Sequence, residues 1–310
     1  MPTPLTKLRQ AVVSRGFTPA TWTPVASEGR AEEATIQVAD VMEPGRPLAG
    51  SPVGDPEECR EPLAFLDGTQ RYEVVGYAGV TPIVHATITA AVMIRQHRQL
   101  KVFARHERRL VVSREAVLDS LHDQLDGAVA VAIPDRNPPH VVGDLQLASR
   151  EVDKYRGHLE VEAGIDFRRE SNAWLVVDGS LGDSREWAND PRMIGVCKSH
   201  ATLPFEGADL EAYLRILPGH RSPVFQPTGR RYFPVYSWAL RLRKWEGKDL
   251  LHGLVRLEAA PIPETIASAD QVSRWLLAER SPVSMPDPRW DRLLYGIRSV
   301  EQFLRATSER

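Results

Sequence analysis

Cysteine is nearly absent from this 310-residue chain, which contains only Cys59 and Cys197. Two cysteines cannot form a disulfide framework, so the composition favours a reducing compartment, and we expect a cytoplasmic protein. Cys197 and His200 have a Cys-x-x-His spacing, but the sequence offers no second half of a zinc site. No apolar run approaches the about 20 residues of a membrane span, and the first residues lack the apolar segment of a signal peptide.

A strong excess of charge of either sign is also missing. The chain has 39 Lys and Arg against 41 Asp and Glu, a net charge of −2, which excludes a uniformly basic nucleic-acid-binding protein but allows a local basic surface. The Gly-x-x-x-x-Gly-Lys-Ser/Thr loop and the Gly-x-Ser-x-Gly motif are both absent. Serine-hydrolase chemistry is therefore not expected, and any ATP hydrolysis would belong to a partner.

Proline and glycine divide the chain. Residues 41–62 contain five Pro and three Gly, which indicates an irregular connector. The apolar spacing over 5–16 predicts a short helix before it. We therefore expect an N-terminal helical arm and connector over 1–54, and a main domain over 55–310.

The main domain mixes strand and helix patterns. Residues 63–94 are rich in Val, Ile, Thr and Tyr and predict a short strand meander. The patterns that follow predict helices over 113–127, 144–163, 269–280 and 288–306, strands over 128–134, 173–179 and 192–200, and a hairpin that joins 232–245 to 250–260. Together they predict an α/β fold in which a mixed sheet is flanked by helices.

Two apolar segments end in Asp-Gly followed by a hydroxyl residue: "FLDGTQR" (65–71) and "LVVDGSLG" (175–182). Asp-Gly is a common hairpin turn, which is the simplest interpretation of either segment alone. The second segment, however, has the apolar pattern of a strand buried on both faces. Both Asp67 and Asp178 fall at the carboxyl end of a predicted strand, where open α/β sheets gather their ligands.

A phosphatase with an Asp-x-Asp-Gly-Thr motif is excluded, because Phe65 and Val176 occupy the position of its nucleophilic Asp. The remaining hypothesis is that carboxylates from separate strands converge on divalent metal. Oxygen ligands suit Mg²⁺ or Mn²⁺, and two such ions about 3.5–4 Å apart stabilise both the attacking and the leaving oxygen of a phosphodiester. A third carboxylate is needed, and the helix before the second motif offers Glu151, Glu160 and Glu162. A solvated surface position is the alternative for each of them.

Basic segments supply candidate contacts to a nucleic acid. Residues 95–114 are rich in Lys and Arg and contain a single Glu, which indicates either an edge that contacts phosphates or a solvated connector. In 229–245 the alternating Tyr236, Trp238, Leu240 and Leu242 predict core positions, which leaves Arg230, Arg231, Arg241 and Arg243 for phosphates. In the last predicted helix, Asp291, Tyr295 and Arg298 share one face. This row could contact a metal-bound phosphate, or it could be a surface salt bridge with a neighbouring Tyr. The candidate DNA contacts are Arg95, Arg98, Lys101, Arg105, Arg230, Arg231 and Arg298.

Several segments together resemble the NurA family of nucleases. They are "FLDGTQR", "WLVVDGSL", "MIGVCKSH" and the C-terminal "PDPRWDRLLYGIRSVEQFL", and their order and spacing cover roughly residues 60–305. The resemblance implies an RNase H-like fold over 55–310 and a Mn²⁺- or Mg²⁺-dependent DNA nuclease. It also implies a homodimer that acts with a HerA-type hexameric ATPase in DNA end processing or antiviral defence.

The resemblance also implies roles for individual residues. Asp67 and Asp178 correspond to metal ligands of the family, and Glu160 matches the acid on the helix before the second motif. Lys198 would lie near the scissile phosphate or orient a carboxylate, and Asp291 falls at the family's last polar site position. Two other functions stay open: a catalytically silent subunit that binds DNA or the ATPase, and a hydrolase of small phosphate esters.

Overall fold

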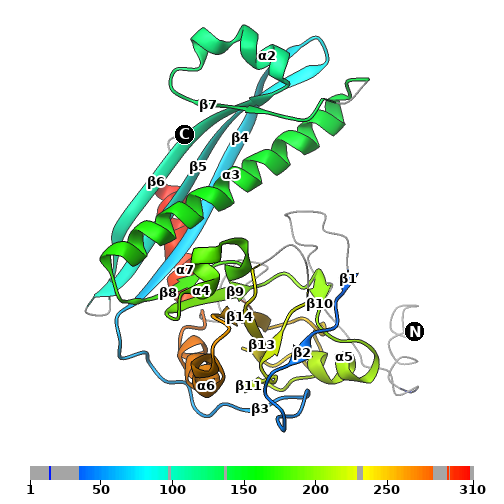
Figure 1. Ribbon diagram of the computed structural model, residues 1–310, viewed down its shortest axis with the longest axis vertical. Helices are drawn as coiled ribbons and strands as arrows, with labels where there is room; N and C mark the ends of the chain where they lie inside the picture. Colours follow the sequence, from blue (N-terminus) through cyan, green and yellow to red (C-terminus); the bar gives the residue numbers. More distant parts are fainter. Residues whose placement is uncertain are drawn as a thin grey trace, which may run out of the picture. The chain divides into compact units, whose positions relative to one another are not determined.

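The computed structural model describes Ser14, residues 35–96, 99–135, 138–228 and 233–281, Arg292 and residues 294–307. The helix expected over 5–16 lies outside these residues except for Ser14. The chain divides into two compact units (Figure 1). One unit contains 1–58, 179–183 and 195–295, and the other contains 59–178, 184–194 and 296–310. No helix among the described residues is long and apolar enough to cross a membrane.

The second unit is built on three long antiparallel strands, β4 (Leu63–Ala78), β5 (Thr81–Gln96) and β6 (Gln99–Ser113). Two short strands extend this sheet with parallel pairing. β8 (Trp174–Val177) lies beside β4, and β7 (Val129–Ala132) lies beside β6. The sheet therefore contains both parallel and antiparallel pairs, which confirms the predicted mixed sheet of an α/β fold.

Helices cover both faces of this sheet. The long helix α3 (Val141–Glu170) runs along β4, β5 and β6 and contacts all three (Figure 1). Gly68 of β4 faces α3, whereas Phe65 of the same strand packs against Gly296 in α7 (Tyr295–Thr307). Because side chains alternate between the faces of a strand, Phe65 and Gly68 point to opposite sides, so α3 and α7 flank the sheet.

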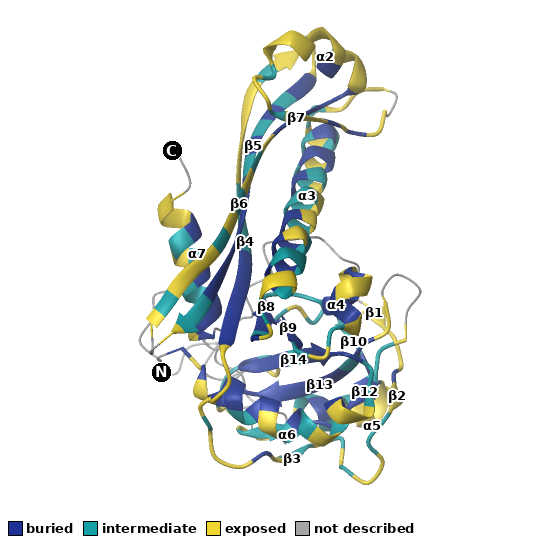
Figure 2. Ribbon diagram, turned by 60° about the vertical axis from the view of Figure 1, so that its left-hand side comes forward, coloured by how far each residue is buried: buried dark blue, intermediate teal, exposed yellow. Residues whose placement is uncertain are grey.

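Burial changes along β4. Its first five residues, Leu63 to Asp67, are buried, and most residues from Arg71 onward are exposed (Figure 2). The change follows the pairing, because β8 accompanies β4 only from Leu63 to Leu66. The burial of β4 therefore ends close to the point where its pairing with β8 ends, whereas β5 stays largely buried.

The first unit contains the predicted hairpin. β13 (Tyr236–Arg241) pairs antiparallel with β14 (Leu254–Ala259), which also pairs with the second half of β9 (Met193–Cys197). Short strands complete the sheet: β2 (Asp40–Val41), β3 (Ser51–Pro52), β11 (His220–Arg221) and β12 (Phe225–Gln226). A separate parallel pair joins β1 (Thr35–Ile36) to β10 (Thr202–Leu203). The described part of this unit also contains the helices α5 (Gly207–Leu214) and α6 (Pro263–Ala278).

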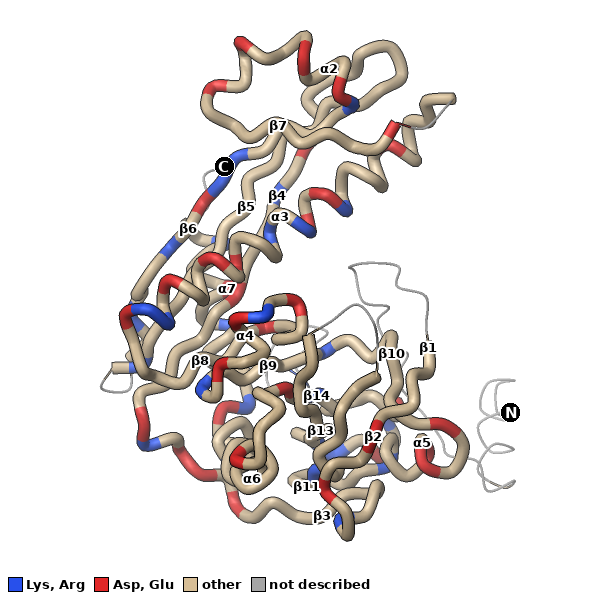
Figure 3. Tube along the Cα trace, in the orientation of Figure 1, with Lys and Arg blue, Asp and Glu red and all other residues tan. Residues whose placement is uncertain are grey.

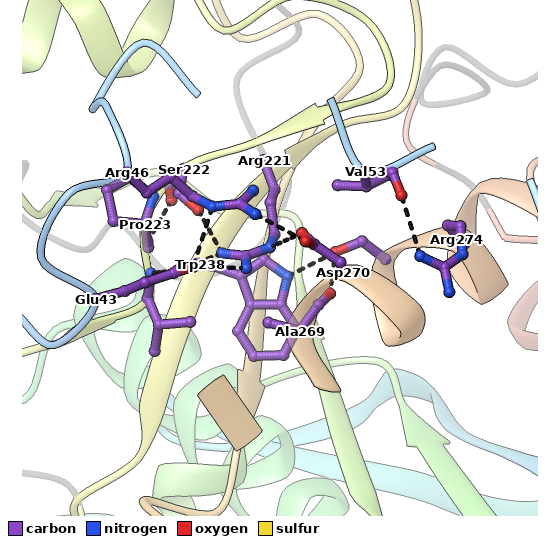
Figure 4. A network of polar contacts seen from close by, with 12 residues as sticks. Glu43, Arg46, Val53, Arg221, Ser222, Pro223, Trp238, Ala269, Asp270 and Arg274 are labelled. Carbon is purple, nitrogen blue, oxygen red and sulfur yellow. Dashed lines mark hydrogen bonds and ion pairs between the residues drawn. The ribbon is translucent and has the colours of Figure 1, made fainter. Parts of the chain in front are cut away.

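A buried ion network holds the N-terminal segment of this unit to its sheet (Figure 4). Arg221 is 1% exposed and donates through Nε to Asp270 Oδ1 at 2.6 Å and through Nη1 to Glu43 Oε2 at 2.6 Å. Arg46 bridges the same two carboxylates, at 3.1 Å from Glu43 and 2.8 Å from Asp270. The two carboxylates balance the charges of Arg221 and Arg46, so the buried guanidinium is compensated.

The predicted strand meander and the first helix predicted after it differ in length from the elements of the structure. The strand meander is longer than predicted, because β6 continues through the basic segment that was expected to be an edge or connector. The helix predicted over 113–127 is limited to α2 (Glu115–Ser120), followed by a 3-10 turn at His122–Gln124. Of its predicted apolar stripe, Val117, Leu121 and Leu125 are only partly buried, so little burial is available to extend the helix.

Candidate active site

Asp67 and Asp178 are the residues that follow the last parallel pair of β4 and β8. The register pairs Leu66 with Val177, and the backbone N–H of Asp178 donates to the carbonyl oxygen of Leu66 at 3.2 Å. Asp67 is 7% exposed, and its Oδ1 accepts from the backbone N–H of Gly68 at 2.8 Å. The structure therefore places Asp67 and Asp178 beside each other on neighbouring strands. Asp178 follows the end of β8, as predicted, but β4 continues to Ala78, so Asp67 lies within a strand and not at its carboxyl end.

Glu160 of α3 reaches the same edge because Gly68 has no side chain. A Cβ atom at position 68 would lie 2.8 Å from both Cγ and Cδ of Glu160, closer than real carbon contacts allow. Glu160 is 7% exposed. Gly68 thus provides the space in which the carboxylate of Glu160 lies against the strand backbone, one residue along β4 from Asp67. Because side chains alternate along β4, Asp67 itself points to the opposite face from Gly68.

Of the three helical carboxylates considered from the sequence, only Glu160 is placed in this way. Glu151 pairs with Lys154 on the surface at 3.3 Å, and Glu162 pairs with Arg108 of β6 at 2.9 Å. Both interactions are exposed ion pairs of α3. The packing of α3 against β4 therefore distinguishes Glu160 from its neighbours.

One guanidinium, that of Arg156, lies among these acids. Its Nη1 donates to Oε1 of Glu160 four residues later in α3, and its Nε donates to Oε1 of Gln70 at 3.1 Å. Gln70, on β4, donates through Nε2 to Oδ1 of Asp153 at 2.6 Å. The helical spacing puts Asp153, Arg156 and Glu160 on one face of α3, and Gln70 fixes the guanidinium from the strand.

The acids of the site act together on the charge of Arg156. Burial of the guanidinium opposes its charge, yet the pKa of Arg156 is raised above its ordinary value because the nearby carboxylates outweigh burial. In order of effect, these are the carboxylates of Glu160, Asp67, Asp153 and Asp178. Carboxylates of two neighbouring strands and of one helix therefore all favour the charged form of this guanidinium.

The donor chemistry of this cluster fits a hard divalent cation. Mg²⁺ and Mn²⁺ are bound by carboxylate oxygens, and the cluster contains several from separate elements. In the described part of the chain, however, no group of three or more His, Cys, Asp or Glu side chains is arranged to hold a metal ion. The carboxylate nearest β4, that of Glu160, is held instead by the guanidinium of Arg156.

The other predicted site residues are placed as follows. Lys198 directly follows β9 in the first unit, and its carbonyl oxygen accepts from Nη1 of Arg292 at 3.2 Å. Arg298 lies on α7 of the second unit, partly buried, whereas Tyr295 at the start of that helix is 55% exposed. Asp291 lies outside the described residues, so its assignment stays a prediction.

Most of the predicted DNA contacts that the structure describes lie at the end of β5 and along β6. Lys101 and Arg105 are exposed on β6, and Arg105 pairs with Glu107. At the end of β5, the guanidinium of Arg95 lies 5.4 Å from the centre of the Phe65 ring. Acidic and basic positions are interspersed along β6 and α3 (Figure 3). Arg98, Arg230 and Arg231 lie outside the described residues.

Arg241 was expected to reach phosphates, and the structure corrects this expectation. Its side chain is fully buried and donates to the carbonyl oxygens of Ile216, Leu214, Leu250 and His252. Trp238, Leu240 and Leu242 are fully buried, as their alternation predicts. Because β13 is covered on both faces, its arginine supports the surrounding loops and is not available to a ligand.

Arg156 and Gln70 are the site residues that the sequence patterns did not identify. The signal for Arg156 was present, because it lies three residues after one acid and four before another on a predicted helix. Such spacing also occurs in ordinary surface ion pairs, for example between Glu211 and Arg215. Only the contact of Arg156 with Gln70 on β4 distinguishes Arg156 from such a surface ion pair.

Comparisons with known proteins find no matching family model and no significant match among curated proteins. Among solved structures, the chain is similar to the NurA nuclease from Sulfolobus solfataricus, with 9% identity, a TM-score of 0.45, and coverage of 81% of this chain and 85% of that one. It is also similar to the catalytic domain of human Endonuclease V, with 14% identity, a TM-score of 0.33, and coverage of 99% and 96%. These values are too low to assign an activity.

Proposed function

We propose that this protein is a divalent-metal-dependent DNA nuclease that hydrolyses phosphodiester bonds. One observation carries the proposal: Asp67 and Asp178 lie side by side where the pairing of β4 with β8 ends, and the carboxylate of Glu160 lies against Gly68, the next residue of β4. Buried acids are costly unless they are paired or hold a cation. Carboxylates from several elements gathered at a strand end are typical of sites that bind Mg²⁺ or Mn²⁺.

In this proposal each residue has a defined role. Asp67, Asp178 and Glu160 would hold the metal, and the resemblance to the NurA family would add Asp291 as a further ligand. A bound Mn²⁺ or Mg²⁺ supplies an activated water and stabilises the charge that develops on the phosphodiester. The resemblance to the NurA family would give Lys198 the role of binding the scissile phosphate, since a lysine ammonium binds phosphate as a point charge.

DNA is held by the basic residues outside the acid cluster. Lys101 and Arg105 on the exposed surface of β6, together with Arg95 and Arg298, contact the phosphate backbone, and Arg98, Arg230 and Arg231 extend this set. Contacts of this kind are electrostatic and independent of sequence, so binding weakens as salt rises. The proposal therefore includes no base-specific recognition.

We also propose how this nuclease assembles with itself and with a partner. The segments that resemble the NurA family imply a homodimer that works with a HerA-type hexameric ATPase, in DNA end processing or defence. The chain carries no nucleotide-binding loop of the Walker type, so ATP-driven movement along DNA is assigned to the partner.

The test is cleavage of end-labelled single- and double-stranded DNA by the purified protein with Mn²⁺, Mg²⁺ or EDTA. Asp67→Asn and Asp178→Asn are expected to lose at least about a hundredfold in rate while they retain DNA binding in a gel-shift assay. Asp166→Asn, on the exposed face of α3, is the control and should cleave like the wild type.

The alternative is a catalytically silent subunit that binds DNA or the ATPase. It is favoured if the wild type does not cleave DNA even with a HerA-type ATPase present, and if Asp178→Asn changes neither DNA binding nor ATPase binding. Turnover of a small chromogenic phosphodiester without any activity on DNA would instead indicate a hydrolase of small phosphate esters.

A further inference from the structure

Arg156 is held by two different groups of the second unit. Its Nη1 contacts Glu160, the acid that lies against Gly68, and its Nε donates to Gln70 at 3.1 Å. Gln70 also joins Asp153 at 2.6 Å, and Asp153 lies three residues before Arg156 on the same helix. The guanidinium therefore has one acid on each side of it along α3.

We propose that Arg156 sets the metal affinity of the site. It holds Glu160 while no metal is bound, and it turns to Asp153 when a divalent cation takes Glu160. This inference rests on the proposed nuclease function and adds a residue that positions a ligand of the same site.

The charges support this exchange. A guanidinium stays protonated at all ordinary pH values, so Arg156 cannot release Glu160 by losing a proton and must move instead. A metal ion bound by Glu160 and its neighbours would repel a guanidinium left in place, because like charges at about 4 Å repel strongly at a partly buried site. Asp153 lies three residues before Arg156 on the same helix and shares the contact with Gln70. The carboxylates of both acids raise the pKa of Arg156.

Gln70 makes the exchange a small movement. The amide oxygen of Gln70 accepts from Nε of Arg156, while its amide nitrogen donates to Asp153. The same side chain therefore contacts the guanidinium and its second partner. A rotation of the guanidinium about this contact replaces Glu160 by Asp153 and needs no change in the backbone of α3 or β4.

The experiment measures Mn²⁺ binding to the full-length protein by isothermal titration calorimetry, for the wild type and three variants. Arg156→Gln removes the competing charge and is expected to tighten Mn²⁺ binding by about tenfold or more. Asp153→Asn removes the second partner and is expected to weaken it. Arg169→Gln, which removes an exposed arginine from the same helix, should bind Mn²⁺ like the wild type.

Thermal unfolding in EDTA and in Mn²⁺ provides the second readout. Without metal, Arg156→Gln leaves the acids uncompensated, so its Tm in EDTA is expected to fall below that of the wild type. Added Mn²⁺ should raise the Tm of Arg156→Gln more than that of the wild type, because tighter binding stabilises the folded state more. If Arg156→Gln does not fold in EDTA, Arg156→Lys replaces it and is expected to bind Mn²⁺ with intermediate affinity.

The outcomes separate this inference from the proposed function. Equal Mn²⁺ affinity of the wild type and Arg156→Gln, in a protein that cleaves DNA, overturns the role of Arg156 and leaves the nuclease standing. Weaker binding by Arg156→Gln overturns it as well, since Arg156 would then support the metal and not compete with it. A wild type that neither binds Mn²⁺ nor cleaves DNA overturns both.

Discussion

The carboxylate of Glu160 on α3 lies against the backbone of Gly68 on β4, in the space that a side chain at position 68 would fill. Gly68 is also the residue whose N–H binds the carboxylate of Asp67 at 2.8 Å. One glycine thus makes room for one acid and binds another. The Asp-Gly pair, common in turns, here lies within a continuous strand that runs to Ala78.

Gly68→Ala is expected to displace Glu160 from β4. The added Cβ would lie 2.8 Å from Cδ of Glu160, so the carboxylate must move away while the strand itself tolerates alanine. We expect the rate of DNA cleavage to fall by about tenfold or more, with a far-UV circular dichroism spectrum like that of the wild type. The control is Gly76→Ala in the same strand, where an added Cβ has no neighbour within 4 Å. Equal rates for Gly68→Ala and wild type would contradict the placement of Glu160.

Two glycines of α3 should respond to alanine with opposite signs. At Gly157 a Cβ meets nothing within 4 Å, so alanine should stabilise the protein by about 0.5–1 kcal/mol through its higher helix propensity. At Gly164 a Cβ would lie 2.8 Å from Nε1 and Cζ2 of Trp187, a residue 3% exposed. Overpacking there should cost about 1–3 kcal/mol. Urea unfolding of the two variants measures both changes, and the same sign for both would contradict the packing of α4 (Arg185–Asn189) on α3.

The end of β8 and the end of the buried part of β4 were predictable from the sequence, although β4 itself continues to Ala78. The run "AWLVV" is apolar without alternation, as a strand buried on both faces requires, and the structure buries Leu175, Val176 and Val177. The position of Asp178 after such a strand, and of Asp67 after "LAFL", then follows from the end of each apolar run. The local sequence pattern was sufficient to place these two residues, because the burial of β4 ends where its pairing with β8 ends.

The third acid and its partner could not be predicted in the same way. Glu151, Glu160 and Glu162 lie on the same helix, and which of them faces the sheet depends on how α3 is rotated and where it crosses β4. Tertiary packing decides which of the three faces the sheet, and Gly68 contributes by leaving space for Glu160. Likewise β6 was not recognised as a strand, because its exposed charged residues form ion pairs, such as Arg108 with Glu162, that the apolar pattern does not show.

His200 predicts a pH dependence of stability. Removal of the ring from water lowers its pKa from 6.5 to about 4, although the contact of Nε2 with the carbonyl oxygen of Leu254 at 3.0 Å opposes this. A histidine whose folded pKa is lowered contributes stability that is complete above pH 6.5 and is lost as the pH falls towards 4, because the unfolded chain binds the proton first.

His200→Gln retains a donor for the carbonyl oxygen of Leu254 but cannot take up this proton. Urea unfolding between pH 7 and 4.5 should therefore show a smaller loss of stability for His200→Gln than for the wild type. His122→Gln, which replaces an exposed histidine, is the control and should follow the wild-type curve. Parallel curves for all three proteins would show that folding does not lower the pKa of His200.

Glu43 predicts a second pH dependence, at lower pH. Burial of its carboxylate raises the pKa, but hydrogen bonds from Arg221 at 2.6 Å and from the N–H of Val224 at 3.0 Å outweigh this and lower it below 4.5. A carboxyl group whose folded pKa is lowered contributes stability that is present above 4.5 and is lost as the pH falls through the folded value. Glu43→Gln should therefore cost about 1–2 kcal/mol at neutral pH and much less near pH 3, as measured by urea unfolding across this range. Glu211→Gln, which removes an exposed ion pair, should stay near the wild type throughout. A cost at Glu43 that does not depend on pH would mean that the carboxylate charge contributes nothing to the network around Arg221.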